Sequence, residues 1–120
     1  MMKPLFICYE RCSTCQKAQK WLDAQHVAYD LRPIKEQNPT AEELSAWQKT
    51  SGLPLRRFFN TSGMKYRELN LKDRLAQMTE EEMLSLLASD GMLVKRPLLI
   101  TENAALPGFR EEEWKAALHL

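Results

Sequence analysis

The chain of 120 residues has no long apolar run, no excess of either charge and only three cysteines. A membrane-spanning helix needs roughly 18 consecutive apolar residues, whereas the first apolar stretch, Leu5–Tyr9, is followed at once by Glu10 and Arg11. The sequence therefore predicts neither a transmembrane segment nor a secretion leader. With a net charge of +1, a general affinity for nucleic acids or anionic membranes is not expected.

The composition is that of an ordinary globular protein, with 44% hydrophobic and 28% charged residues. The length fits one domain, and the chain has neither an internal repeat nor a low-complexity linker. We therefore expect a single domain that spans residues 1–120.

The three cysteines lie within the stretch Cys8–Cys15. A disulfide scaffold would use an even number of cysteines spread along the chain. The clustering favours cysteines with a chemical role in a reducing environment, and thus a cytoplasmic protein.

Hydrophobic patterning predicts strand, helix and strand in the first third of the chain. Leu5–Tyr9 has the pattern of a buried strand. An amphipathic helix follows residues 12–15 and ends near His26, and Val27–Leu31 forms a second strand. This order is a βαβ unit with parallel strands.

Residues 40–90 are predicted to be a helical insertion in this α/β domain. Thr40–Glu43 and Thr79–Glu82 both have the Ser/Thr-x-x-Glu pattern that caps a helix N-terminus. Short helical turns are expected at residues 53–59 and 66–69. An antiparallel hairpin of Pro97–Thr101 with Ala104–Leu106, and a final helix from Glu111, complete a ββα unit.

The motif Cys12-Ser13-Thr14-Cys15 lies where the first strand gives way to the first helix. Such a C-x-x-C in a βαβ context indicates a redox pair. Cys12 at the helix N-terminus is the expected nucleophile, because unpaired amides and the cations Arg11 and Lys17 favour its thiolate. Cys15, one helical turn further, is the expected resolving cysteine.

Zinc binding is the alternative for these cysteines. A structural zinc site needs four ligands, and the chain offers only the clustered cysteines together with His26 and His119. No second C-x-x-C and no paired-histidine motif completes a site, so we expect no bound metal. For Cys8 a buried position in the first strand is favoured.

Two further motifs have both a structural and a functional interpretation. Arg96 precedes Pro97 at the start of a strand, where a proline fits or adopts a cis bond; by itself Arg96 would be a surface charge. The string Arg56–Phe59 can be a basic-aromatic patch for nucleic acid, but one helical turn with a buried face gives the same string. The near-neutral chain favours the second interpretation.

Taken together, these motifs resemble the arsenate reductase (ArsC) family, and within it the Spx/MgsR-like branch that keeps a C-x-x-C. The resemblance implies a thioredoxin-like fold of the glutaredoxin type, with a four-stranded mixed sheet and the helical insertion. It places Pro97 as a cis-proline and Arg96 beside Cys12. The motifs that carry it are Tyr9-x-x-Cys12-Ser13-Thr14-Cys15-Gln16-Lys17-Ala18, Phe58–Gly63, Asp90-Gly91-Met92, Leu93–Leu98 and Gly108-Phe109-Arg110.

The resemblance also implies roles for site residues. Cys12, Cys15 and Arg96 would be catalytic, and Ser13, Thr14 and Pro97 would contact the substrate. Family arsenate reductases hold the oxyanion with three arginines and use glutathione and glutaredoxin as reductants. This chain has Asn60 at the second arginine position, and Arg110 matches the third only after a shift of one residue.

Two hypotheses on function follow. The first is an arsenate-reductase-like thiol–disulfide oxidoreductase, which binds no cofactor, acts on a small oxyanion or a disulfide, and draws electrons from glutathione or a thioredoxin- or glutaredoxin-type protein. The second is a redox-sensing regulator of the Spx/MgsR type, which would bind the RNA polymerase α subunit without contacting nucleic acid directly.

Overall fold

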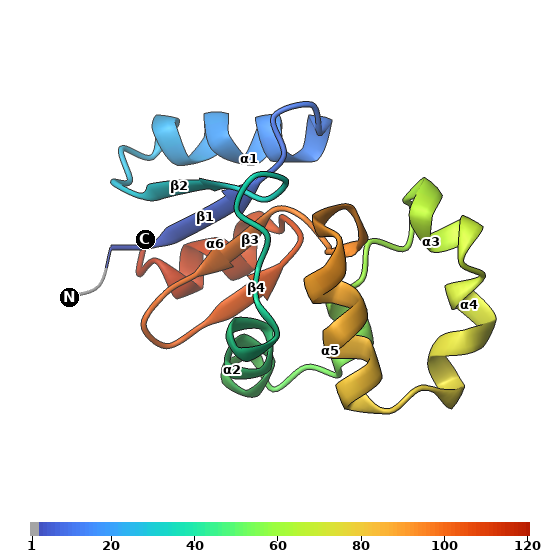
Figure 1. The fold of residues 1–120 in the computed structure, drawn as a ribbon. Coiled ribbons are helices and arrows are strands. Elements are labelled where there is room, and N and C mark those ends of the chain that lie inside the picture. The colour runs from blue at the N-terminus through green and yellow to red at the C-terminus, as the bar shows by residue number, and fades with distance from the viewer. Residues whose placement is uncertain (1–2) are drawn as a thin grey trace.

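A computed structural model describes residues 3–120, and its centre is a four-stranded mixed sheet (Figure 1). The strands β1 (Leu5–Cys8) and β2 (Asp30–Pro33) pair in parallel. The strands β3 (Leu98–Ile100) and β4 (Ala105–Pro107) form an antiparallel hairpin whose β3 lies antiparallel to β1. The order β2-β1-β3-β4 gives the predicted α/β, thioredoxin-like fold of the glutaredoxin type.

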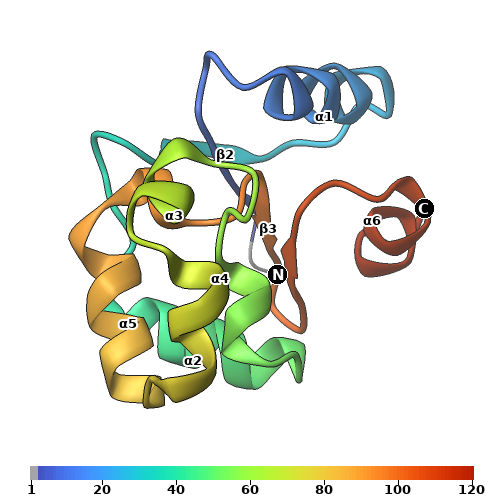
Figure 2. The same cartoon turned by 90° about the vertical axis from the view of Figure 1, so that its right-hand side faces the viewer.

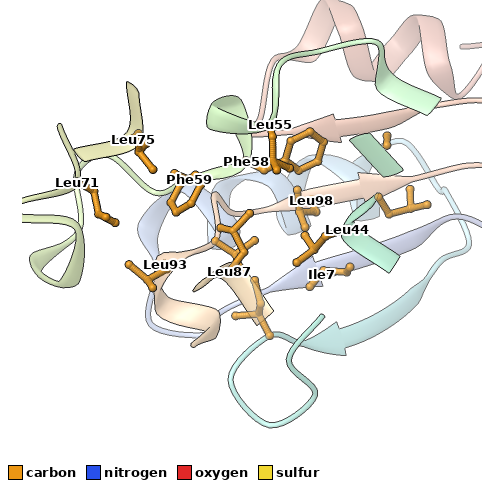
Figure 3. Packing of buried hydrophobic residues seen from close by; sticks show 14 residues of the cluster. Ile7, Leu44, Leu55, Phe58, Phe59, Leu71, Leu75, Leu87, Leu93 and Leu98 are labelled. Carbon is orange, nitrogen blue, oxygen red and sulfur yellow. The ribbon is translucent and has the colours of Figure 1, made fainter. Parts of the chain in front are cut away.

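Helices cover both faces of the sheet. Side chains of successive residues in a strand point to opposite faces, so a continuous apolar strand has apolar side chains to bury on both. On one face, Phe6 and Cys8 pack with helices α1 (Ser13–Ala24) and α6 (Glu111–Ala117) in an apolar cluster that includes the fully buried Trp114. On the other face, Ile7 joins a larger cluster with residues of the helical segment (Figure 3). The central strands β1 and β3 are thus buried on both sides, as their short apolar sequences predict, whereas the edge strand β2 is partly exposed.

The segment between β2 and β3 consists of helices joined by short loops. Its two main helices begin at the predicted capping boxes, in which Thr40 and Thr79 each exchange hydrogen bonds with the glutamate three residues later. In Figure 2 the small helices α3 and α4 lie on the side that faces the viewer. The elements of the segment are α2 (Ala41–Ser51), η1 (Leu55–Phe58), α3 (Met64–Glu68), α4 (Leu71–Arg74), η2 (Leu75–Gln77), α5 (Glu80–Ser89) and η3 (Gly91–Leu93).

Two sequence predictions need correction. The sequence predicts the second strand at Val27–Leu31, but β2 is Asp30–Pro33. The reason is that Val27 donates its N–H to the carbonyl of Leu22 at the end of α1, and ladder pairing begins only with Asp30 opposite Leu5. The sequence also gave no sign of α4, a helix of four residues.

None of the helices within residues 3–120 has both the length and the apolar character needed to cross a membrane.

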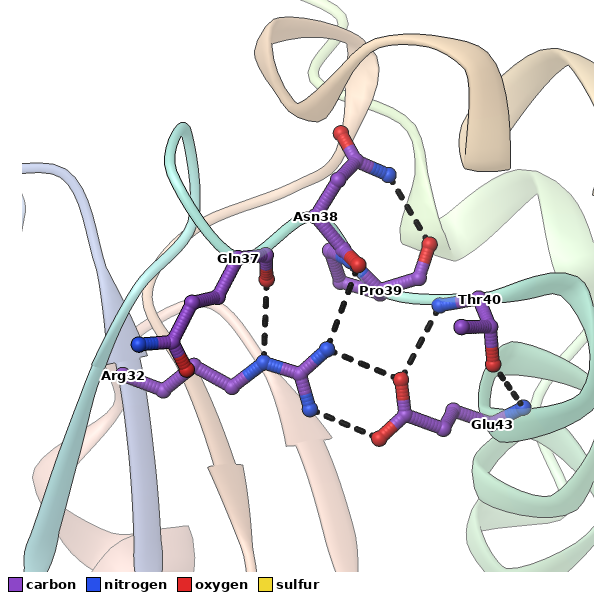
Figure 4. A network of polar contacts seen from close by, with 6 residues as sticks. All are labelled: Arg32, Gln37, Asn38, Pro39, Thr40 and Glu43. Carbon is purple, nitrogen blue, oxygen red and sulfur yellow. Dashed lines mark hydrogen bonds and ion pairs between the residues drawn. The ribbon is translucent and has the colours of Figure 1, made fainter.

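Arg32 joins the edge of the sheet to the helical segment (Figure 4). Its guanidinium donates to both carboxylate oxygens of Glu43, at 2.6 and 2.8 Å, and to the carbonyls of Gln37 and Asn38. Glu43 also accepts from the backbone N–H of Thr40 at 3.0 Å. The hydrogen bonds from Arg32 lower the pKa of Glu43 to about 2. One side chain therefore fixes β2, the following loop and the start of α2.

We predict that Arg32→Ala lowers the free energy of unfolding by about 1 to 2 kcal/mol at neutral pH, because a half-buried carboxylate loses its partner. Glu43 has a pKa of about 2 in the folded chain against an ordinary 4.5, so the pair stabilises the folded state above the ordinary value. The difference between wild type and variant should shrink as the pH falls through this range. Urea denaturation at several pH values measures it.

Lys3→Ala is the matched control, because the ion pair of Lys3 with Asp30 is exposed. It should change stability by less than about 0.5 kcal/mol. Equal losses for the two variants would contradict the role given to Arg32.

Candidate active site

Cys12 lies at the N-terminus of α1, as the sequence predicts. After β1 the chain turns, with the Cys12 N–H donating to the carbonyl of Tyr9 at 3.0 Å, and Cys12 then takes the N-cap position in an extended conformation. Its carbonyl accepts the first helical hydrogen bond, from Gln16 at 3.0 Å. The Cys12 side chain is therefore next to the amides of the first helical turn, which have no partner within the helix.

The surroundings of the Cys12 sulfur lower its pKa. Partial burial alone would raise the pKa, but hydrogen bonds from the backbone N–H and the thiol of Cys15 act in the other direction. The backbone N–H of Thr14 and the positive charge of Arg96 add to this effect, and the pKa of Cys12 falls below its ordinary value. Cys12 is thus the cysteine best suited to react as a thiolate.

The cation that acts on Cys12 comes from a distant part of the chain. From the sequence, Arg11 and Lys17 are the cations expected to lower the pKa of Cys12, but both of these side chains are exposed. The charge that lowers the pKa of Cys12 belongs to Arg96, which precedes β3.

Cys15 and Cys8 are buried thiols behind Cys12. Cys15 accepts a hydrogen bond from the Tyr9 N–H at 3.4 Å, yet burial raises its pKa to about 12. Burial raises the pKa of Cys8, in the first strand as expected, to about 11. All three cysteines are free thiols in this structure. The contact between Cys12 and Cys15 makes them the pair placed for disulfide formation.

The bond between Arg96 and Pro97 is cis, in agreement with the resemblance. The Arg96 guanidinium lies 5.2 Å from the centre of the Tyr9 ring, and its Nη1 donates to the carbonyl of Met92 at 3.3 Å. Its Nε is buried and has no hydrogen-bond partner among residues 3–120. A buried donor without a partner is rare in folded proteins, and Arg96 is also one of the residues that line the cavity next to Cys12.

Cys12 lines a cavity of about 730 Å³, and cations from three segments of the chain line the same cavity. Its positive side chains are Arg57, Lys95, Arg96 and Arg110. Thr14, Asn60 and Ser62 add neutral polar groups, and within the described part of the chain no carboxylate side chain lines the cavity. The cavity is therefore suited to a negatively charged ligand in reach of the Cys12 sulfur.

The cavity does not contain every residue that the sequence put forward. Cys12, Thr14 and Arg96 lie together there, whereas Ser13 is exposed outside the lining and Pro97 is buried beside it. Pro97 instead accepts the Gly108 N–H at its carbonyl, at 2.8 Å.

Three lining residues are absent from the predicted site. From the sequence, Arg57 is interpreted as part of a structural turn, and Lys95 has no predicted role. Asn60, which replaces an expected arginine, is also in the lining. The signals in the sequence were the adjacency of Lys95 to Arg96 and the basic-aromatic string Arg56–Phe59, which contains Arg57.

The same region gives no metal site. Across residues 3–120, no group of three or more His, Cys, Asp or Glu side chains is placed to hold a metal ion.

The chain is similar to proteins of one known family. The family model described as the ArsC family matches residues 8–117. The chain belongs to the ArsC family. It is 51% identical to YusI of Bacillus subtilis strain 168 over 114 residues, which is 95% of this chain and 97% of YusI. The crystal structure of an ArsC-family-related protein from Bacteroides fragilis is 55% identical, with a TM-score of 0.94, and the match covers 97% of this chain and 98% of that one.

A more distant relative is the regulatory protein MgsR of Bacillus subtilis strain 168. It is 28% identical over 108 residues, which cover 90% of this chain and 84% of MgsR. The proteins similar to this chain therefore include one that is named as a regulator.

We predict that iodoacetamide labels Cys12 first at about pH 6 to 7, because it is the cysteine with the lowered pKa. Cys15 and Cys8, with pKa values of about 12 and 11, should stay unlabelled in the folded chain. Arg96→Met should move the pH dependence of Cys12 labelling upward, and Lys17→Met should leave it unchanged. Peptide mapping identifies the labelled cysteine, and early labelling of Cys15 would contradict the assignment.

Proposed function

We propose that this ArsC-family chain is an arsenate-reductase-like thiol–disulfide oxidoreductase, with Cys12 as the nucleophile and Cys15 as the resolving thiol. The observation that carries the proposal is a Cys12 thiol whose pKa the buried Cys15 helps to lower and that lines a cavity with several cations. A nucleophile, an internal second thiol and an anion site are the parts that such a reaction needs.

With a disulfide substrate, the Cys12 thiolate attacks one sulfur, forms a mixed disulfide and releases the other sulfur as a thiolate. Cys15 then gives up its proton and attacks the Cys12 sulfur. The bond between Cys12 and Cys15 forms as the second substrate sulfur leaves as a thiolate. The substrate disulfide gains two electrons, and the two cysteines lose them.

The pKa of Cys15 favours this order of events. Burial raises it first, and the charge of the neighbouring Cys12 raises it further. In the mixed disulfide Cys12 carries no charge, so that second contribution is gone. Cys15 therefore becomes easier to ionise once Cys12 has reacted.

With arsenate, the Cys12 thiolate would form a sulfur–arsenic bond and one arsenate oxygen would leave as water. Attack of Cys15 on the Cys12 sulfur would then leave the bonding pair on arsenic, which is reduced from As(V) to As(III). Arg96 and the other cations of the cavity would stabilise the oxyanion, since charge-assisted bonds from arginine are strong.

The next turnover needs two electrons from outside the chain. We propose that they come from glutathione or from a dithiol protein of the thioredoxin or glutaredoxin type, in the cytoplasm. No bound cofactor takes part in these steps.

To test the proposal, two variants are exposed to glutathione disulfide, and the amount of mixed disulfide that each forms is compared. Cys15→Ser should accumulate a mixed disulfide at Cys12, because nothing resolves it, and Cys12→Ser should form none. Mass spectrometry of the intact chain and of its peptides gives the answer. The proposal fails if both variants form the adduct equally or if the adduct lies on Cys8.

We predict that Arg96→Ala weakens arsenate binding about tenfold, because the anion loses a charge-assisted hydrogen-bond donor. Disulfide formation between Cys12 and Cys15 should persist. Isothermal titration with arsenate measures the affinity, and Lys20→Ala, an exposed cation outside the cavity, is the control. An affinity equal to that of wild type would make Arg96 a mere structural charge.

A redox-sensing regulator is the second candidate, because MgsR is a relative over most of the chain and Cys15 permits a disulfide switch. Such a regulator would bind the RNA polymerase α subunit in one redox state. A pull-down with that subunit, run beside a turnover assay with arsenate and small disulfides, separates the two. Redox-dependent capture without turnover would favour the regulator.

A further inference from the structure

The charge of this near-neutral chain is unevenly distributed. Residues 55–76 contain six Lys or Arg and two Asp or Glu, a net charge of +4, so the rest of the chain carries −3. The six cations are all exposed, and in the described structure none of them forms an ion pair with a carboxylate. Arg74 helps to lower the pKa of Glu82, which lies at the start of α5.

Three of these cations line a second cavity, of about 480 Å³, in the helical segment. Arg56, Arg57 and Lys72 supply its charge. Apolar side chains complete the lining, among them Leu75, Met78 and Met83, and no carboxylate of residues 3–120 takes part. We call this cavity the Arg56 groove. It combines positive charge with an adaptable apolar surface, since methionine side chains are flexible.

The Arg56 groove adjoins the cavity of Cys12, because Arg57 lines both. The backbone fixes this neighbourhood: Lys95 donates its N–H to the Phe58 carbonyl at 2.7 Å, and Asn60 donates to the Leu93 carbonyl at 2.8 Å. The buried Phe58 and Phe59 hold η1 against the core (Figure 3). In Figure 1 the N-terminal end of α1 points to the side of the molecule on which α3 lies.

We propose that the Arg56 groove docks an acidic segment, with an apolar side chain, of the protein dithiol that reduces the bond between Cys12 and Cys15. The inference rests on the proposed function, which requires a two-electron donor. The positive charge of the groove favours an acidic segment. Because Arg57 lines both cavities, a donor bound in the groove has its cysteines near Cys12. One donor thiolate attacks the Cys12 sulfur and Cys15 leaves as a thiolate; the second donor thiol then displaces Cys12, and the donor ends as a disulfide.

Nucleic acid is the alternative anionic partner for the Arg56 groove. Single strands bind through bases stacked on exposed aromatic rings. The aromatic ring in the groove lining, Tyr66, is half-buried and packs edge-on against Phe59 at 6.5 Å. A reaction at Cys12 also needs a sulfur-bearing partner. Both points favour a protein donor.

The test uses the full chain with its Cys12–Cys15 disulfide formed, and two synthetic dithiol peptides as donors. One carries Glu and Leu residues beside a Cys-x-x-Cys, and the other has Gln in place of each Glu. The wild type should be reduced about tenfold faster by the acidic peptide. The double variant Arg56→Glu, Lys72→Glu should lose this preference, while dithiothreitol should reduce both proteins at the same rate.

The control variant is Lys35→Glu, Lys49→Glu, which makes the same change of net charge at exposed sites outside both cavities. It should keep the preference for the acidic peptide. A preference that survives in Arg56→Glu, Lys72→Glu, or is absent from the wild type, would overturn the docking proposal while reduction by dithiothreitol still supports the redox function. Failure to form the disulfide at all would contradict both.

A labelled single-stranded oligonucleotide provides the last arm. If the wild type binds it and Arg56→Glu, Lys72→Glu does not, with no preference between the peptides, the groove belongs to nucleic acid and the proposal is wrong.

Discussion

Backbone N–H groups in the first turn of a helix have no partner within the helix, and in α1 those of Thr14 and Cys15 help to lower the pKa of the Cys12 thiol. This interaction decides which cysteine carries negative charge. It requires that β1 end at Cys8 and that the chain turn through Tyr9, whose own N–H binds Cys15. The chemistry of the site therefore depends on the junction between a buried strand and the helix that follows it.

The helical segment completes the site from the other side. Its anchor is the pairing of the chain around Phe59 with the chain around Val94. That pairing places Arg57 of η1 beside Lys95 and Arg96. Charges from three distant segments thus surround Cys12, and the Arg32–Glu43 pair fixes how the helical segment leaves the sheet. The cationic cavity is a product of tertiary structure rather than of any local motif.

This division explains how much the sequence could predict. Local signals were sufficient for the capping boxes at Thr40 and Thr79 and for Cys12 at the helix N-terminus, because each depends on residues within one helical turn. The start of β2 was missed because strand pairing with β1 sets it. Arg57 was missed because a buried helical turn and a ligand-binding turn have the same residue pattern.

The central claim is that Cys12 and Cys15 form a reversible redox pair, and equilibration of the chain in glutathione redox buffers tests it most directly. Mass spectrometry of quenched samples should show a reversible loss of two hydrogen atoms, located at Cys12 and Cys15 with Cys8 still reduced. The midpoint should lie above about −300 mV, as for redox-active disulfides. No reversible loss of mass, or stoichiometric zinc on the reduced chain, would contradict the account.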